Sequence, residues 1–341
     1  MADPLLEVRD LKVSFRTEDG LVKAVDGVSF NVDQGEVLGI VGESGSGKSV
    51  TMLTVVRLIH DPNAVFEGEV LYKGRSLMEL SEKEMREVRG REIAMIFQDP
   101  MASLNPVYRI GWQIEEQIRA HMPVSKREAS RRAVGLLAAV GIPHPEQRVN
   151  DYPHQFSGGM RQRAMIALAL SCDPDLLIAD EPTTALDVTI QAQILELIGR
   201  LRHEFRSAVV LITHDMGVIA DTAERMLVMY AGRVVEQGTT HDLFYDPQHP
   251  YTWGLLGSIP RLDRPKAKRL AAIEGQPPSL IGLPPGCHFA PRCAHAFERC
   301  VAEDPQLTAQ VGSGHVDACH LPTEEKRRRR EAEIHPELAS R

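Results

Sequence analysis

The sequence contains few aromatic residues, no long apolar run and no excess of positive charge. Only 5% of its 341 residues are aromatic, including two tryptophans, so it offers little material for stacking nucleic-acid bases. Its 47 acidic residues outnumber its 39 lysines and arginines, and the net charge of −8 argues against general nucleic-acid binding. No segment reaches the roughly 18–20 consecutive apolar residues of a membrane helix. We therefore expect neither a membrane span nor a nucleic-acid partner.

The first four residues also lack the basic segment and apolar run that begin a signal peptide. The expected compartment is the cytoplasm, and any role at a membrane would be that of a peripheral subunit. The 43% of hydrophobic and 25% of charged residues are ordinary for a globular protein. At about 150 residues per domain, the length predicts roughly two domains.

Short apolar segments separated by helical spacers predict an α/β core. Residues 5–32 alternate apolar and polar positions, as half-buried antiparallel strands do. Residues from about 100 to 172 show helical periodicity and predict an inserted helical subdomain. Four continuous apolar runs suit strands buried on both faces of a largely parallel sheet: Val37–Val41, Ile93–Phe97, Leu176–Ala179 and Ala208–Thr213.

Residues 42–49 read GESGSGKS and match the phosphate-binding-loop pattern G-x-x-x-x-G-K-[ST] at every position. The loop follows a predicted buried strand and precedes a predicted helix over residues 50–59. Its glycines let successive N–H groups point at an anion, and the helix N-terminus adds a favourable dipole. Lys48 is expected to reach the β- and γ-phosphates of ATP, and the Ser49 hydroxyl to ligate Mg²⁺. The predicted ATP-binding residues of this loop are Gly42, Ser44, Gly45, Ser46, Gly47, Lys48, Ser49 and Val50.

Two acidic residues, Asp180 and Glu181, follow the apolar run at 176–179. Ligands of open α/β sheets bind at the carboxyl ends of the strands. Two adjacent carboxylates at such a position repel each other unless a cation is close, which favours a metal. We expect Asp180 to hold the Mg²⁺ shell through water and Glu181 to polarise the attacking water as general base.

Residues 156–163, FSGGMRQR, resemble the LSGGQ signature of the ATP-binding-cassette (ABC) ATPases, with Phe for Leu and Met for Gln. With the two motifs above, the chain is similar to this family of P-loop NTPases with a RecA-like core and an antiparallel β subdomain. The resemblance implies that two cassettes pack head to tail, with each ATP between the P-loop of one and the signature of the other. Ser157, Gly158 and Gly159 would then serve the partner's nucleotide.

Four further residues stand where this family places functional groups. The resemblance implies that Gln98 contacts Mg²⁺ and reports the nucleotide state to a membrane partner, and that His214 contacts the γ-phosphate. It also implies that Phe15 stacks on adenine and that Asp187 belongs to the D-loop, residues 184–187, at the dimer seam. ATP binding would close the dimer and drive a coupled motion, which hydrolysis resets. The expected catalytic residues are Lys48, Glu181 and His214.

Other segments resemble one branch of the family, the ATPase subunits of dipeptide, oligopeptide and nickel importers. They are residues 99–106 (DPMASLNP), 249–252 (HPYT) and 273–278 (IEGQPP). The resemblance implies a "D-type" motor subunit at the cytoplasmic face of the inner membrane. Its partners would be an "F-type" ATPase, two transmembrane permease subunits and, indirectly, an extracytoplasmic binding protein. Dipeptides, oligopeptides, nickel chelates and haem are all substrates within this branch.

The composition changes twice along the C-terminal part. Residues 1–255 form the predicted nucleotide-binding cassette, and residues 256–323 a Pro-rich and Cys-rich appendage. Residues 324–341 are almost wholly polar and include five consecutive cations flanked by glutamates. A solvated helix end or frayed tail is the expected state of this charged segment, rather than a basic patch.

Four of the five cysteines lie in this appendage: Cys287, Cys293, Cys300 and Cys319. In a cytosolic chain such a group is more often a metal or cluster site than a set of disulfides. The spacing lacks the close pairs of structural zinc sites and suits a 4Fe–4S cubane, while Zn²⁺ and free thiols remain alternatives. The importer resemblance implies a 4Fe–4S cluster that folds the appendage. His288, His295, His315 and His320 are the possible extra ligands for zinc, and Cys172 is expected to be a buried hydrophobe.

Two alternative functions fit the same motifs. One is a soluble ABC ATPase of iron–sulfur assembly or repair, which a single P-loop without tandem cassettes disfavours. The other is an ATP-binding regulatory subunit without catalysis, which the intact Lys48, Glu181 and His214 disfavour.

Overall fold

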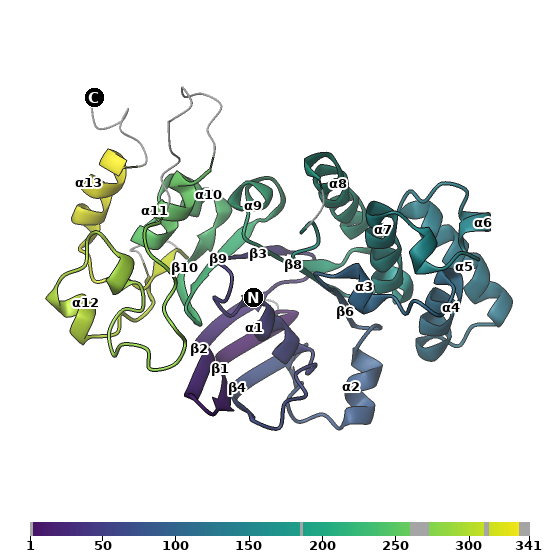
Figure 1. The fold of residues 1–341 in the computed structure, drawn as a ribbon, viewed down its shortest axis with the longest axis horizontal. Coiled ribbons are helices and arrows are strands. Elements are labelled where there is room, and N and C mark those ends of the chain that lie inside the picture. Colours follow the sequence, from purple (N-terminus) through teal and green to yellow (C-terminus); the bar gives the residue numbers. More distant parts are fainter. Residues whose placement is uncertain (1–2, 185–186, 260–272, 310–313, 334–341) are drawn as a thin grey trace. The chain divides into compact units, whose positions relative to one another are not determined.

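The structure is a computed structural model that describes residues 3–184, 187–259, 273–309 and 314–333 (Figure 1). Contacts divide the chain into two compact units. Unit 1 comprises Met1–Leu6, Val32–Val37 and Tyr72–Ile212, and unit 2 comprises Glu7–Asn31, Leu38–Leu71 and Thr213–Arg341.

The core of unit 1 contains three parallel strands. β7 (Leu176–Asp180) pairs with β6 (Ile93–Ile96) on one side and with β8 (Ala208–Thr213) on the other. Every residue of β7 and β8 is buried, as their continuous apolar sequences predict. A short strand β5 (Arg75–Ser76) and helix α2 (Glu82–Val88) precede them in the chain.

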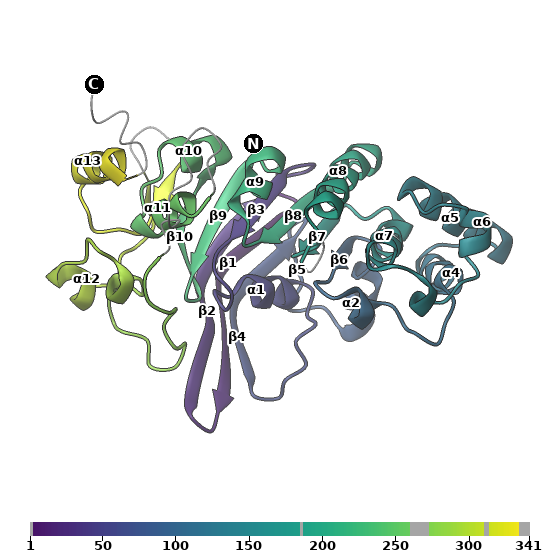
Figure 2. The ribbon, with the colours of Figure 1, turned by 45° about the horizontal axis from the view of Figure 1, so that its top comes forward.

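The predicted inserted helical subdomain is present in unit 1. α4 (Ile110–His121), α5 (Lys126–Ala139) and α7 (Gly158–Ala169) contact one another and lie side by side in both views (Figures 1 and 2). The Ser125 side chain caps α5 by accepting a hydrogen bond from the Glu128 amide at 3.2 Å. The remaining helices of this unit are α3 (Pro100–Ser103), α6 (Pro145–Arg148), α8 (Val188–Phe205) and the 3₁₀ turns Pro153–Gln155 and Leu170–Cys172.

Unit 2 contains an antiparallel sheet in the order β2–β1–β4. Its strands are β1 (Leu6–Thr17), β2 (Gly20–Val32) and β4 (Ala64–Tyr72). Leu11 and Val13 of β1 are fully buried while their neighbours are partly exposed, which confirms the predicted alternation. This sheet is the expected antiparallel β subdomain.

The second sheet of unit 2 has the order β3–β9–β10–β12–β11 among the strands of this unit. β3 (Val37–Val41) runs parallel to β9 (Arg225–Tyr230), and β10 (Arg233–Thr239) returns antiparallel to β9. The short strand β12 (Val316–Asp317) then pairs with β10, and β11 (Thr308–Ala309) with β12. The C-terminal region therefore extends a cassette sheet, which the sequence did not predict.

Helix α10 (Thr240–Tyr245) contacts β9 and β10 of this sheet (Figures 1 and 2). Among the described residues, no helix has the length and apolar character needed to cross a membrane. The helices of unit 2 are α1 (Lys48–Val55), α9 (Met216–Thr222), α10 (Thr240–Tyr245), α11 (Pro250–Gly257), α12 (Glu298–Ala302), α13 (Thr323–Glu333) and the 3₁₀ turn Ala290–Arg292.

The charged C-terminal segment differs from expectation as far as residue 333. α13 is helical, but Lys326 is only 3% exposed and Arg330 is 7% exposed. Lys326 donates to Asp317 at 2.5 Å, and Arg330 pairs with Asp246. The expectation of a wholly solvated segment is therefore wrong for these two cations, because carboxylate partners hold them. Residues 334–341 of this segment lie outside the described residues.

Candidate ATP site

The loop between β3 and α1 has a backbone that requires glycine at both ends. Gly42 and Gly47 have φ values of +154° and +100°. A Cβ atom at Gly42 would lie 2.2 Å from the Met229 carbonyl oxygen, and one at Gly47 would lie 2.5 Å from that of Ala24. The loop thus lies directly against neighbouring backbone, which explains these glycines of the motif.

Lys48, the first residue of α1, is 4% exposed and points back along the loop. Its ammonium group donates to the carbonyls of Gly42 at 2.8 Å and Glu43 at 2.9 Å. Ser44 and Gly45 are exposed, whereas Ser46 is buried. This arrangement leaves the loop tip accessible and holds the Lys48 cation inside the curve where an anion would bind.

The predicted catalytic carboxylate, Glu181, lies in unit 1 and is held by two hydrogen bonds. Asp180 ends β7 and is 6% exposed, and Glu181 follows with a φ of +45°. The Glu181 carboxylate accepts a hydrogen bond from Gln98 Nε2 at 3.0 Å and from the Thr184 hydroxyl at 2.7 Å. A left-handed conformation at a residue other than glycine costs about 1–3 kcal/mol and is common at functional sites. The structure thus joins Gln98 and Glu181, which the sequence placed far apart.

The signature segment forms the start of α7. The Ser157 side chain caps the helix by accepting a hydrogen bond from the Met160 amide at 3.3 Å, and both Ser157 and Gly158 are exposed. Phe156, the residue that departs from the family's leucine, is 3% exposed and packs in the core. Gln162 is buried and donates to the Pro182 carbonyl at 2.5 Å. The N-terminus of α7 is therefore accessible at Ser157 and Gly158.

The other predicted residues divide between the units. Phe15, on β1, and His214, just after β8, belong to unit 2 together with the P-loop. His214 is exposed and Phe15 partly exposed. Asp187 belongs to unit 1, where its carboxylate caps α8 by accepting from the Ile190 amide at 3.0 Å. Ala185 and Leu186 of the predicted D-loop lie outside the described residues.

The four C-terminal cysteines line one small pocket in unit 2. Three histidines, His249, His295 and His320, share its lining. These cysteines form no disulfide, and the Cys287 amide donates to the Cys300 carbonyl at 2.8 Å. Burial raises the pKa of the Cys287 thiol and raises that of Cys319 to about 12.

In the described parts of the chain, no three His, Cys, Asp or Glu side chains are arranged so that they could hold a metal ion. The cluster therefore stays a prediction. All four rival zinc ligands contact other groups. His315 lies 2.7 Å from the Glu236 carboxylate, and His288 lies 3.0 Å from the Ala231 carbonyl. His320 lies 2.9 Å from the Glu303 carbonyl, and His295 lies 2.5 Å from Nη1 of Arg329. Cys172 is 4% exposed, as expected for a buried hydrophobe, and burial raises its pKa.

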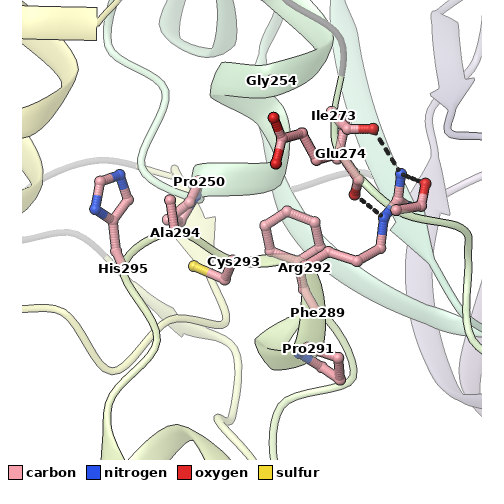
Figure 3. A pocket seen from close by; sticks show the side chains of 11 residues that line it. Pro250, Gly254, Ile273, Glu274, Phe289, Pro291, Arg292, Cys293, Ala294 and His295 are labelled. Carbon is pink, nitrogen blue, oxygen red and sulfur yellow. Dashed lines mark hydrogen bonds between the residues drawn. The ribbon is translucent and has the colours of Figure 1, made fainter.

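A second pocket lies beside the cysteine-lined one and shares Cys293 and His295 with it (Figure 3). Its wall includes Arg292, which contacts Glu43 of the P-loop at 2.5 Å. The sequence indicates neither residue, because Glu43 occupies a variable position of the motif and Arg292 lies about 250 residues further along the chain.

Comparisons with known proteins identify the family of the chain. A family model described as "ABC transporter" matches residues 25–184, and one described as "Oligopeptide/dipeptide transporter, C-terminal region" matches residues 235–300. The oligopeptide transport ATP-binding protein OppD of Bacillus subtilis is 56% identical over 304 residues, which is 89% of this chain and 85% of that protein. The dipeptide transport ATP-binding protein DppD of the same organism is 52% identical over 320 residues, 94% and 95% of the two chains.

A solved structure shares the cassette fold. The dimeric post-hydrolysis state of the ATP-binding cassette MJ0796 bound to ADP and Pi superposes with a TM-score of 0.62 at 28% identity, covering 69% of this chain and 98% of that one. The cassette fold of this chain is therefore that of a known ATP-binding cassette. The chain is a member of the ABC transporter family, an ABC-type ATPase subunit of its oligopeptide and dipeptide branch.

Proposed function

We propose that this chain hydrolyses ATP to power the import of dipeptides or oligopeptides through separate membrane subunits. The observation that carries the proposal is the combination of an ABC cassette with the C-terminal region typical of oligopeptide and dipeptide transporters, at 52–56% identity to OppD and DppD. The proteins compared are named for peptide transport, so peptides are favoured over nickel chelates and haem as the substrate.

The proposed chemistry is attack of water on the γ-phosphorus of ATP, with cleavage of the bond to the bridging oxygen of ADP. The loop N–H groups and Lys48 neutralise the phosphate charge, while Glu181 accepts the proton of the attacking water. The hydrogen bonds from Gln98 and Thr184 orient the Glu181 carboxylate.

Mg²⁺ fits the donor set, because hydroxyl, carboxylate and amide oxygens are the ligands that it prefers. Ser49 and Gln98 would hold it directly and Asp180 through water, and it would supply further charge neutralisation. The remaining contacts follow the family: Phe15 against adenine and His214 at the γ-phosphate.

Glu181→Gln tests the assignment of the base. Glutamine keeps the size and the hydrogen-bond acceptor but cannot take the proton, so ATP should bind and the cassette dimer should remain closed without turnover. The exposed Glu196 on α8 supplies a matched control, and Glu196→Gln should hydrolyse ATP normally. ATPase activity of the assembled complex that is unchanged in Glu181→Gln would refute the assignment.

We propose that Ser157, Gly158, Gly159 and Asp187 act across the interface of a cassette pair. The exposed N-terminus of α7 suits the nucleotide of a second cassette, and MJ0796 is described as a dimer with ADP and Pi. The second cassette would be an F-type ATPase, and two permease subunits and an extracytoplasmic binding protein would complete the importer. The chain would act as a peripheral subunit on the cytoplasmic face of the membrane.

Affinity purification from detergent-solubilised membranes, kept anaerobic and analysed by mass spectrometry, tests this assembly. We expect two multi-span proteins and a second cassette ATPase to copurify. A chain that is absent from membranes and recovers only soluble partners would favour the alternative, a soluble ABC ATPase of iron–sulfur assembly or repair.

We also propose a 4Fe–4S cluster on Cys287, Cys293, Cys300 and Cys319, with Zn²⁺ as the alternative. The support is that all four cysteines line one pocket. Burial raises the pKa of two of these thiols, so their deprotonation needs a nearby cation such as a metal. The four thiols would have to come closer together to ligate it, because no three of them are arranged for a metal ion in the described residues.

Iron, sulfide and zinc analysis of anaerobically purified protein tests the cluster. Cys300→Ser should lose the bound metal, whereas Cys172→Ser, outside the pocket, should keep it. Four irons with sulfide support the cluster, zinc alone supports the alternative, and the absence of both metals would refute a metal site.

A further inference from the structure

Glu43 of the P-loop is held through its amide, its carbonyl and its carboxylate. Its amide donates to the Tyr251 hydroxyl at 2.8 Å, and its carbonyl accepts from Lys48 at 2.9 Å. Its carboxylate accepts two bonds from Arg292, Nη1 to Oε2 at 2.5 Å and Nη2 to Oε1 at 3.1 Å. The residue that follows the first glycine of the loop is therefore fixed by contacts that include the C-terminal region.

Arg292 is itself fixed by its surroundings. Its side chain is 5% exposed, and it donates to the carbonyls of Ile273 at 3.2 Å and Glu274 at 3.0 Å (Figure 3). Further bonds reach the Gly275 carbonyl and the Tyr230 hydroxyl. A two-pronged guanidinium–carboxylate pair restricts geometry more strongly than a single contact does. The hydrogen bond to Glu43 raises the pKa of Arg292, so this cation persists at every relevant pH.

Three aromatic rings support this pair. Tyr230 at the end of β9, Tyr251 in α11 and Phe289 in the C-terminal region are each at most 4% exposed. The Tyr230 ring lies 4.7 Å from that of Tyr251 and 5.2 Å from that of Phe289. Tyr251 and Phe289 also contact each other at 5.4 Å. Such contacts resist displacement of the hydroxyl that binds the Glu43 amide.

We propose that Arg292 is a positioning residue for ATP binding, through which the C-terminal region sets the nucleotide affinity of the P-loop. Glu43 puts a negative charge into a loop that must accept the phosphates of ATP. Arg292 neutralises this charge and holds the carboxylate in place through two hydrogen bonds. The carbonyl of the same residue holds Lys48, so the pair also fixes the phosphate-binding cation.

The test is a pair of single variants and their combination in the full-length chain. Arg292→Gln leaves the Glu43 charge without its guanidinium, and we expect the Kd for the magnesium complex of AMP-PNP to rise about tenfold or more. Glu43→Gln removes the repelling charge. The double variant should therefore bind several-fold more tightly than Arg292→Gln alone.

Titration calorimetry gives the Kd values, and steady-state ATPase assays should show a higher KM with a smaller change in kcat. Arg299→Gln, which removes an exposed pair with Glu303 in the same region, is the matched control and should bind like the parent. A normal Kd for Arg292→Gln, or a double variant no tighter than Arg292→Gln, would overturn the proposal.

Arg292→Lys provides the test if Arg292→Gln fails to fold. Lysine keeps the charge but loses the two-pronged contact, so the Kd, measured well below the melting temperature of the variant, should rise several-fold. An unchanged Kd in that variant overturns the proposal. These binding measurements use the isolated chain, so their outcome is independent of whether the importer assembles.

Discussion

Substituting alanine for Gly47 tests how far the P-loop depends on its close contact with β2. Gly47 has a φ of +100° and precedes the first residue of α1. An added Cβ would lie 2.5 Å from the Ala24 carbonyl oxygen, a distance that real Cβ atoms do not adopt. Because the obstacle is backbone, the P-loop or β2 must move.

Gly45, in the same loop, is a control that separates the cost of backbone strain from the cost of a steric clash. Gly45 has a φ of +77°, but no heavy atom of the described residues would lie within 4 Å of a Cβ atom added there. The left-handed conformation costs a residue other than glycine about 1–2 kcal/mol. About 0.4–1 kcal/mol of this is offset because alanine lowers the conformational entropy of the unfolded chain. Overpacking adds about 1–3 kcal/mol. Gly45→Ala should therefore cost about 0–1.6 kcal/mol, and Gly47→Ala should cost about 1–3 kcal/mol more than that.

Urea denaturation of the full-length variants measures this difference in unfolding free energy. Titration with Mg-ADP follows the consequence for the site, because a displaced loop no longer aims its N–H groups at the phosphates. We expect Gly47→Ala to lose more affinity than Gly45→Ala. Equal stability losses, within about 0.5 kcal/mol, would refute the argument from the Ala24 contact.

Two further predictions concern buried ion pairs of the C-terminal region. Lys326→Met leaves the fully buried Asp317 without its cation and should lower the free energy of unfolding, measured in urea, by about 3–5 kcal/mol. Adding Asp317→Leu to this variant should restore most of that stability. Burial opposes protonation of His315, but the hydrogen bond and charge of Glu236 outweigh it and raise the pKa of His315. This pair should therefore stabilise the fold fully below about pH 6.5 and lose its effect as the pH rises through the higher folded pKa. His315→Gln should flatten this dependence of the melting temperature on pH, and an unchanged profile would contradict it.

The buried strands and the P-loop were predictable because their signals are local. Val37–Val41 and Leu176–Asp180 are continuous apolar runs, which leave few alternatives to a strand buried on both faces. The loop glycines have an equally local cause, since the backbone between them must wind around an anion. Helix ends were less predictable. The helix expected over residues 50–59 is α1 over Lys48–Val55, and Arg57 then adopts a φ of +51° without a glycine or proline signal.

The contacts of the C-terminal region could not be predicted, because they join residues far apart in the chain. A run of cations beside glutamates predicts a solvated segment. Lys326 nevertheless pairs with Asp317, which lies in the two-residue strand β12 and is held in position by the pairing of β12 with β10. Gln98 and Glu181 show the same limit within unit 1. Each has its own local motif, but their hydrogen bond depends on the parallel pairing of β6 with β7.

The change in composition predicts a domain boundary at residue 256. Such a boundary would separate residues of the cassette from partners in the C-terminal segment. Past that point, β12 supplies the neighbour of β10, and His315 supplies the partner of Glu236, a carboxylate with no exposed surface. Arg292 also lies beyond this boundary, and it holds Glu43 of the P-loop. The segment after the cassette thus pairs with β10, provides a partner for the buried Glu236 carboxylate and, in our proposal, positions the phosphate-binding loop. The C-terminal segment therefore contributes to the stability of the cassette and, in our proposal, to its affinity for ATP.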